Sequence, residues 1–335
     1  MEMDHKNNAK ISGESIADNL LVSQLRTIFA KELAENPAIN TEWFLNRFIR
    51  ARKYNMKEVI KMLEQYFKWR KNVNMNKIMN MDPIRRAKIR NIHESGFCGV
   101  DREGRPIIIE RFMLTDIKAF LSSEYDDVRE AYMLSKYERF AHIIYPLASQ
   151  AAKKRIDSIL VIYDLKGVNF SKFFDSNFKK FVKFLIGVVQ DNYPEMLAKL
   201  IMVNVSVTFR AIWAVIKHWM DKQTLSKMEL HGGVPTERLL QYIDIDTLPD
   251  FLGGNNKTPI KEDSGPWKEA YHQSVEQKTF FLKDRTPEYE YFYTEEEREK
   301  IKEKKTKNPI KIEEENNNDS LSIPSFNARL ETHEK

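Results

Sequence analysis

The sequence contains one cysteine, Cys98, so an intramolecular disulfide is impossible. The polar start, MEMDHKNNAK, lacks the apolar segment of a signal peptide. No apolar run approaches the ~20 residues that a membrane-spanning helix needs, and the longest, 159–163 and 200–203, have the length of strands. Glu2 stands where N-myristoylation requires glycine, and the chain ends in THEK without a prenylation motif. These absences predict a soluble, cytoplasmic protein that meets membranes only at their surface.

The motifs of several enzyme classes are also missing. Neither glycine-rich phosphate pattern, GxGxxG or GxxxxGK[ST], occurs, and the GxSxG elbow of serine hydrolases is absent. In a cysteine phosphatase loop starting at Cys98, Gly104 stands where the arginine is needed, and Arg105 follows one residue too late. The histidines show no metal-ligand spacing. We therefore expect neither catalysis nor a metal site.

Charge is abundant but nearly balanced, with 54 basic and 49 acidic residues and a formal net charge of +5. A nucleic-acid-binding domain usually concentrates basic charge on one face at a pI higher than the 8.9 of this chain. A weak positive excess suits brief contact with an anionic membrane surface. We therefore expect no nucleic-acid partner and a monomer that associates with membranes peripherally.

Hydrophobic periodicity divides the chain into regions. Residues 1–14 are expected to be disordered, and 15–80 carry helical patterns, with Thr41 as a predicted N-cap. Within 81–267, strand-like segments (106–112, 158–164, 200–205 and 228–231) alternate with helix-like ones (128–144, 177–190, 209–220 and 236–242). Such alternation predicts an α/β fold with a parallel or mixed sheet. Residues 268–307 form a charged extension, and 308–335 are predicted to be a disordered tail.

The most informative segment is 209–220, FRAIWAVIKHWM. Its bulky apolar residues follow helical spacing and form one face: Phe209, Ile212, Trp213, Ile216, Trp219 and Met220. Tryptophan favours the boundary between apolar and aqueous surroundings. The pattern fits either an ordinary core helix or a helix that covers a lipid pocket and touches the bilayer. Gly253 and Gly254, shortly after Pro249, suit a flexible hinge behind such a helix.

Two further segments carry groups that suit a phosphate. In DKQTLSKM, 221–228, a helix puts the Thr224 hydroxyl and the Lys227 ammonium one turn apart on the same face. Such a pair near a helix N-terminus can bind phosphate, although a capping threonine and a solvated lysine are the ordinary interpretation. In LNRFIRARKY, 45–54, arginines alternate with apolar residues, and Arg52 is a candidate to reach a phosphate across a domain junction.

Together these segments resemble the CRAL-TRIO family, and most closely its phosphatidylinositol transfer protein branch. LNRFIRARKYN and FKWRK resemble the family's helical N-terminal unit, and GVDREGRPIIIER resembles its first strand with the preceding turn. VIYDLKGVN, DNYPEML, IMVNVSVTF, TLSK, LPDFLGG and SGPW follow in the family's order, so the resemblance covers about residues 20–267. It implies a small helical unit, 15–80, followed by a mixed α/β lipid-binding domain, 81–267, with a hydrophobic pocket and a gating helix.

Residue by residue, the resemblance implies a headgroup site for phosphatidylinositol. The arginine of the RAR-K motif falls on Arg52, the glutamate of YPE on Glu195, and the threonine and lysine of TLSK on Thr224 and Lys227. In the family this lysine and this glutamate form an ion pair, so Lys227 and Glu195 are expected to pair here. The gating helix of the family falls on 209–220.

The pocket wall departs from the pattern of family members that also bind phosphatidylcholine. Those members carry Ser, Thr and Tyr where this sequence has the apolar residues Phe97, Ile108, Ile159 and Val161. Hydroxyl donors to a choline phosphate are therefore missing. The resemblance thus implies that phosphatidylcholine is a poor ligand.

The favoured function is a carrier that transfers phosphatidylinositol between membranes or presents it to lipid kinases, with a bound phospholipid as its ligand and no cofactor. One alternative is a carrier of another hydrophobic ligand, such as a sterol, tocopherol or retinoid. The headgroup residues argue against that alternative, because an uncharged ligand needs no phosphate site. The other alternative is a lipid-sensing adaptor without net transfer, whose charged tail from Thr294 recruits a partner.

Overall fold

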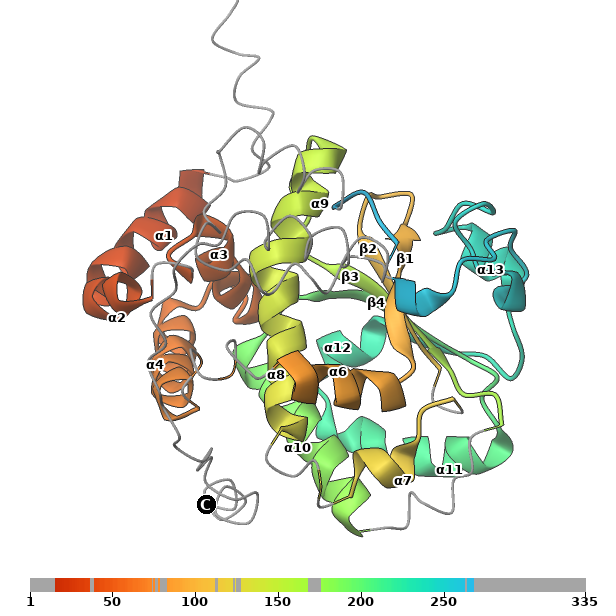
Figure 1. Ribbon diagram of the computed structural model, residues 1–335. Helices are drawn as coiled ribbons and strands as arrows, with labels where there is room; N and C mark the ends of the chain where they lie inside the picture. The colour runs from red at the N-terminus through yellow and green to blue at the C-terminus, as the bar shows by residue number, and fades with distance from the viewer. Residues whose placement is uncertain are drawn as a thin grey trace, which may run out of the picture.

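A computed structural model of the chain describes residues 16–36, 39–73, 75, 78, 83–111, 114–122, 124, 128–167, 176–262 and 264–267 (Figure 1). The segments 1–14 and 308–335 and the charged extension 268–307, for which we made predictions, lie outside the described residues. The described residues form a group of N-terminal helices and a larger lobe built on a sheet (Figure 1).

The N-terminal helices lie together at the left of Figure 1. They are α1 (Ile16–Ile28), α2 (Ala30–Glu35), α3 (Glu42–Ala51) and α4 (Met56–Asn72). The predicted cap is confirmed, because the Thr41 hydroxyl accepts a hydrogen bond from the Phe44 amide at 3.3 Å. The apolar faces of these helices meet in a core of their own, which includes Leu25, Phe48 and Leu63. Helical periodicity therefore predicted this region correctly.

The lobe is built on a five-stranded sheet in the order β1-β2-β3-β4-β5. The strands are β1 (Ser95–Val100), β2 (Pro106–Arg111), β3 (Ile159–Asp164), β4 (Leu197–Val203) and β5 (Met228–Leu230). β1 pairs antiparallel with β2, and the remaining neighbours are parallel. The predicted α/β fold with a mixed sheet is confirmed, and the structure adds β1 to the predicted strands.

A tight turn in DREGRP connects β1 to β2. The Asp101 carboxylate accepts hydrogen bonds from the backbone amides of Glu103 and Arg105 at 2.9 and 2.8 Å. Gly104 has a φ of +77°, a backbone conformation that favours glycine. Cys98 is buried in the strand before this turn, and burial raises the pKa of its thiol to about 11. The segment is therefore a structural turn, and its thiol is not activated as in a phosphatase loop.

Helices surround the sheet. They are α6 (Pro83–Ile92), α7 (Ile117–Phe120), α8 (Arg129–Arg139), the π-helical turn η4 (Phe140–Ile144), α9 (Tyr145–Ala152), α10 (Ser176–Asn192), α11 (Val207–Ile216), the 3₁₀ turn η6 (Lys217–Trp219), α12 (Lys222–Ser226), α13 (Thr236–Leu240), and the 3₁₀ turns η7 (Asp250–Leu252) and η8 (Ile260–Glu262). In Figure 1, α8 and α9 form one long rod across the sheet. The predicted helix 128–144 is thus the first part of a longer one.

The two faces of the sheet have different partners. Side chains alternate along each strand, so Ile107 and Ile109 of β2 pack into a closed core with Leu239 of the α13 side. The intervening residues, such as Ile108 of β2 and Val161 of β3, face the opposite side, which contains a cavity. Both faces are therefore covered, as expected for nearly continuous apolar strands.

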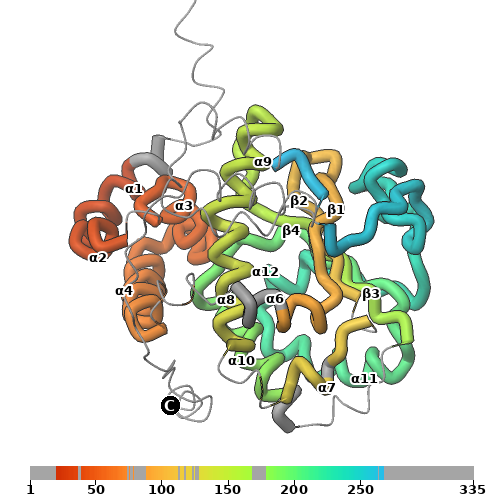
Figure 2. The backbone as a smooth tube through the Cα atoms, in the orientation of Figure 1, coloured from red at the N-terminus to blue at the C-terminus, as the bar shows by residue number. Residues whose placement is uncertain are grey.

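The last described segment closes the lobe beside β1. Figure 2 shows 264–267 running along this strand, where the Gly99 amide donates a hydrogen bond to the Ser264 carbonyl at 2.8 Å. Trp267 is only 1% exposed, and its ring packs edge-on against Phe97 with centroids 5.0 Å apart. The SGPW segment is thus part of the folded lobe.

A buried ion pair joins the N-terminal helices to the lobe. Nη1 of Arg70, in α4, lies 3.0 Å from both carboxylate oxygens of Glu138, in α8. The Tyr193 hydroxyl donates a further hydrogen bond to Glu138 at 2.9 Å. The ring of Trp69 packs edge-on against Tyr193 with centroids 5.9 Å apart. These contacts fix α4 against α8 and the end of α10.

Candidate functional site

A cavity of about 740 Å³ lies on the α10 and α11 side of the sheet. Its lining comes from β2, β3 and β4 together with α8, α10, α11 and the α12 segment, and it is mostly apolar. This volume falls within the ~300–1,000 Å³ typical of sites for small organic ligands. The fold therefore provides the hydrophobic pocket that the resemblance implied.

Three of the four predicted pocket-wall residues line the cavity. Ile108, Ile159 and Val161 line the cavity from adjacent strands, and Ile108 is paired directly with Val161. Phe97 is not among the lining residues, because β1 directs it into the core, where its ring packs against Phe140 at 5.6 Å and Trp267 at 5.0 Å. The part of the wall that Ile108, Ile159 and Val161 form is apolar, and Phe97 lies behind it.

The 209–220 segment is not one continuous helix. The Ser206 hydroxyl caps α11 by accepting from the Phe209 amide at 3.1 Å, and α11 ends at Ile216, before the 3₁₀ turn η6. Four residues of the predicted apolar face line the cavity: Phe209, Trp213, Ile216 and Met220. Ile212 packs against an apolar cluster around Met202, and Trp219 is half-buried outside the cavity lining.

The opposite side of α11 is apolar and exposed. Val207 is 85% exposed and Val215 is 57% exposed. Isolated apolar residues on a surface are ordinary, but here they share a helix with side chains that line the cavity. The helix therefore separates the cavity from solvent and presents apolar side chains on both sides.

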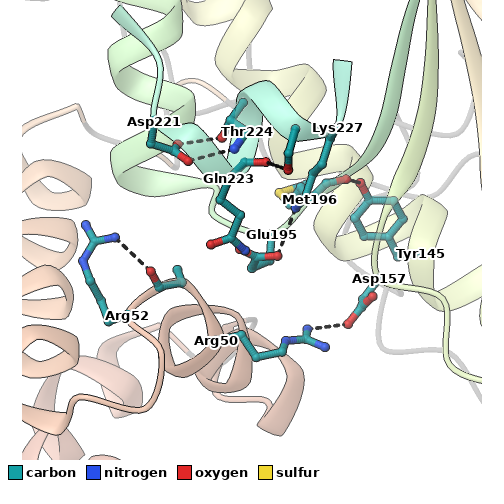
Figure 3. Close-up of polar contacts among 12 residues, drawn as sticks. Arg50, Arg52, Tyr145, Asp157, Glu195, Met196, Asp221, Gln223, Thr224 and Lys227 are labelled. Carbon is teal, nitrogen blue, oxygen red and sulfur yellow. Dashed lines mark hydrogen bonds and ion pairs between the residues drawn. The ribbon is translucent and has the colours of Figure 1, made fainter. Parts of the chain in front are cut away.

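The predicted headgroup residues of the α12 region lie together (Figure 3). Lys227 Nζ is 3.1 Å from Glu195 Oε2, so the expected ion pair is present. The Gln223 side-chain amide donates to the other Glu195 oxygen at 2.6 Å. Asp221 caps α12 and accepts from both the Thr224 amide, at 2.8 Å, and the Thr224 hydroxyl, at 2.6 Å. Glu195, Thr224 and Lys227 all line the cavity, in a short polar cluster at its α12 end.

Arg52 reaches the same cavity from the N-terminal helices. It is the C-cap residue of α3, and it is among the lining residues. Its Nη1 donates to the neighbouring Ala51 carbonyl at 3.3 Å (Figure 3). Among the described residues, no hydrogen bond or ion pair joins it to Glu195, Thr224 or Lys227. The structure thus brings three of the four predicted residues together and places Arg52 on the facing element.

The two predicted hinge glycines lie in a closely packed turn. A Cβ atom on Gly254 would lie 1.9 Å from the Leu248 carbonyl oxygen, and one on Gly253 would lie 2.4 Å from Thr236 Oγ1. The Gly254 amide also donates to the Pro249 carbonyl at 3.0 Å. Steric packing therefore accounts for both glycines, and their role as a hinge stays a prediction.

Sequence reasoning missed a second polar cluster in the cavity lining. His93, Glu110 and Lys136 come from the segment before β1, from β2 and from α8, and all three are among the lining residues. They are separated by long stretches of chain, so no local spacing connects them. Asp221 and Gln223, which orient the predicted headgroup residues, were missed because family motifs name only the ligand-binding positions.

Other kinds of site are not found within the part of the chain that the structure describes. There, no group of His, Cys, Asp and Glu side chains is arranged to hold a metal ion. None of the described helices combines the length and apolarity needed to cross a membrane.

Comparison with known proteins identifies relatives in sequence. Residues 90–254 match the CRAL/TRIO domain. The phosphatidylinositol/phosphatidylcholine transfer protein SFH7 of Arabidopsis thaliana is 31% identical over 258 residues, which cover 75% of this chain and 47% of SFH7. The Sec14 cytosolic factor of Schizosaccharomyces pombe is 28% identical over 229 residues, which cover 67% of this chain and 79% of the relative. The chain spans less than half the length of SFH7.

A solved structure shares the fold. The crystal structure of Sfh5 matches with a TM-score of 0.60 at 16% identity, covering 79% of this chain and 98% of Sfh5. The mixed sheet, the apolar cavity and the sequence relatives agree with one another. The chain therefore carries a CRAL-TRIO domain and is related in sequence to phosphatidylinositol/phosphatidylcholine transfer proteins.

Proposed function

We propose that the protein carries one phosphatidylinositol molecule, with its acyl chains in the cavity and its phosphate beside Lys227. It transfers this lipid between cytoplasmic membrane surfaces or presents it to lipid-modifying enzymes such as lipid kinases. The proposal rests on one observation above all: the Lys227–Glu195 pair lines a cavity whose other walls are mostly apolar. Exposing acyl chains to water costs about 0.8 kcal/mol per CH₂, so apolar walls remove most of the barrier to moving the lipid. The proposal includes no catalytic step.

The polar cluster at the α12 end suits a phosphate with attached hydroxyl groups. Glu195 holds the Lys227 ammonium in place and is itself held by Gln223, so the charge that meets the phosphate has a fixed position. The Thr224 hydroxyl donates its proton to Asp221 in this structure. It can therefore accept from an inositol hydroxyl as it stands, or donate to the phosphate after turning away from Asp221.

Exchange of the lipid requires that the cavity open, and we propose α11 as the gate. Its inner face lines the cavity through Phe209, Trp213 and Ile216, and its outer face exposes Val207 and Val215. At a membrane the outer face leaves water for the interface, which favours binding there. Gly253 and Gly254 are proposed as the hinge for this movement.

The proposal is tested by transfer of radiolabelled phosphatidylinositol between vesicles. Lys227→Ala and Thr224→Asp should abolish transfer without changing the thermal midpoint of unfolding appreciably. Lys199→Ala is the matched control, because Lys199 pairs with Glu229 at 2.9 Å with similar exposure but lies outside the cavity lining. Normal transfer by Lys227→Ala would remove the assignment of this pair to the headgroup.

A second measurement separates the alternatives. Mass spectrometry of lipids that co-purify with the protein should find phosphatidylinositol, whereas a carrier of a sterol, tocopherol or retinoid would retain that ligand instead. A lipid-sensing adaptor would bind phosphatidylinositol but would not move it between vesicles. The expected result is both binding and transfer by a monomer.

A further inference from the structure

A buried ion pair stands in the cavity lining, away from the proposed headgroup site. Lys136 Nζ, from α8, lies 2.9 Å from Glu110 Oε1, from β2, and 3.2 Å from Ser95 Oγ. His93 lies beside the pair, with Nε2 3.7 Å from the other Glu110 oxygen. His93, Glu110 and Lys136 are 5%, 8% and 8% exposed and all line the cavity. A wall that only has to hold acyl chains has no use for these polar groups.

The cluster is electrically neutral as a whole. Burial alone would raise the pKa of Glu110, but the charge of the Lys136 ammonium more than offsets it, so the pKa lies well below its usual range and the carboxylate is ionised. Burial lowers the pKa of His93, and the Lys136 charge lowers it further, so the imidazole is neutral. A bound anion would therefore meet Glu110 and a bound cation would meet Lys136. The cluster favours an uncharged polar group.

Hydrogen-bonding capacity remains on both members of the pair. An ammonium has three N–H donors, and among the described residues Lys136 has acceptors for two of them, Ser95 and Glu110. The 3.7 Å separation from His93 is too long for a hydrogen bond, so Glu110 Oε2 has acceptor capacity left. One group that both donates to a carboxylate and accepts from an ammonium is a hydroxyl.

Strand register places this cluster far from the headgroup site. Glu110 pairs with Tyr163 of β3, which pairs with Met202 of β4. Strand β4 begins at Leu197, and Met202 is five residues further along it. At roughly 3.3 Å per residue, the two positions are about 16 Å apart. Glu195 precedes Leu197, at the other end of the same strand. A lipid whose headgroup is at Glu195 brings only acyl chain towards Glu110.

We propose that Glu110 and Lys136 form a second subsite in the cavity, which binds the hydroxyl group of a neutral lipid alcohol. The hydroxyl donates to Glu110 Oε2 and accepts from Lys136 Nζ, while the apolar body of the alcohol occupies the space that acyl chains otherwise fill. His93 lies beside the carboxylate, with its ring tilted against Phe120 (centroids 5.7 Å apart) and edge-on to Tyr132 (6.0 Å). The inference rests on the proposed function, since it assumes that the cavity holds lipid.

The test uses two probes that differ only at the hydroxyl, tritiated 1-hexadecanol and its methyl ether. The full chain should bind the alcohol about tenfold more tightly, because the ether keeps the acceptor but loses the donor to Glu110. The double variant Lys136→Met/Glu110→Leu should bind both probes equally while still transferring phosphatidylinositol. The variant Lys136→Gln/Glu110→Gln, which keeps a donor and an acceptor without charge, should restore part of the preference.

Each outcome decides between the proposals. Equal affinities of the unmodified protein for alcohol and ether overturn the subsite and leave a structural ion pair, and so does a preference that survives in Lys136→Met/Glu110→Leu. Failure to bind the alcohol while phosphatidylinositol is still transferred overturns the subsite alone. If the unmodified protein neither binds the alcohol nor transfers phosphatidylinositol, the proposed carrier function is overturned as well. If the double variant does not fold, the comparison of the two probes on the unmodified protein still decides.

Discussion

Removing the Arg70 guanidinium should destabilise the protein by about 3–5 kcal/mol, the usual consequence of leaving a buried charge without its partner. Arg70 Nη1 contacts both oxygens of Glu138 at 3.0 Å, and the two side chains are 10% and 2% exposed. In Arg70→Met, Glu138 keeps its hydrogen bond from Tyr193 and the neighbouring His142 at 3.2 Å. Neither contact replaces the guanidinium that Glu138 loses.

The assay is urea unfolding followed by tryptophan fluorescence, with linear extrapolation to water. Arg26→Met is the matched control, because the Arg26–Glu42 pair is 3.8 Å apart with side chains 42% and 50% exposed. It should cost at most about 1 kcal/mol. The double variant Arg70→Met/Glu138→Leu should recover much of the lost stability, since it leaves no unpaired charge. A loss for Arg70→Met no larger than that of Arg26→Met would refute this reasoning.

The same network bears on function. Tyr193, which donates to Glu138, lies two residues before Glu195. Glu195 itself adopts a positive φ of +59°, a backbone conformation that needs support from its surroundings. Arg70→Met should therefore slow phosphatidylinositol transfer per folded molecule as well as lower stability. Unchanged transfer per folded molecule would show that the loop holds its shape without Arg70.

Three further predictions concern the cavity and its gate. Phosphatidylcholine should be transferred much more slowly than phosphatidylinositol, and Ile159→Ser/Val161→Thr should raise the rate of phosphatidylcholine transfer by supplying hydroxyl donors. Parallel vesicle assays measure both rates, and similar rates for the two lipids in the unmodified protein would contradict this prediction. Trp219→Ala should slow lipid exchange markedly with only a small fall in melting temperature, because Trp219 is half-buried outside the cavity. A large fall in melting temperature with unchanged exchange would show that Trp219 is a core residue and not part of the gate. Because the pKa of His93 is lowered in the folded protein, unfolded chains bind an extra proton as the pH falls below ~6.5, and stability should fall by up to about 1.4 kcal/mol per pH unit. His93→Gln should remove this contribution between pH 7 and pH 5, whereas His218→Gln, at an exposed position, should keep it.

The fold could be predicted where local pattern and tertiary environment agree. The 3.6-residue period gave the N-terminal helices, and Thr41 gave the start of α3. β1 was not predicted, because SGFCGV has two glycines and no alternation, and only its pairing with β2 makes it a strand. The 209–220 helix was drawn too long, because its apolar spacing continues through the 3₁₀ turn that ends it. Periodicity reports which face is buried, not where the backbone changes its hydrogen bonding.

The residues of the candidate site also differ in how far the sequence alone could predict them. Thr224 and Lys227 lie within one short segment, so their spacing alone suggested a shared face. Arg52 was one candidate in an arginine-rich segment until the family resemblance assigned it to the headgroup, and Glu195 came only from that resemblance. Phe97 was assigned to the pocket wall from its alignment with a family position, but β1 turns it towards Trp267. Residues brought together from separate elements, as the Glu110 cluster is, leave no local signal in a sequence.

A carrier must bind its lipid about as well as the membrane does, or it would never release it. The ion pair in the cavity is compatible with this requirement, because Lys136 and Glu110 satisfy each other at 2.9 Å when only acyl chain lies beside them. Phosphatidylinositol therefore loses little binding free energy when its acyl chains lie beside the pair. An alcohol gains only the hydrogen bonds that Lys136 and Glu110 do not make to each other or to Ser95. Two ligands of different chemistry can then compete for one cavity with similar free energies. On this reasoning, adding 1-hexadecanol should displace bound phosphatidylinositol from the unmodified protein but much less readily from Lys136→Met/Glu110→Leu.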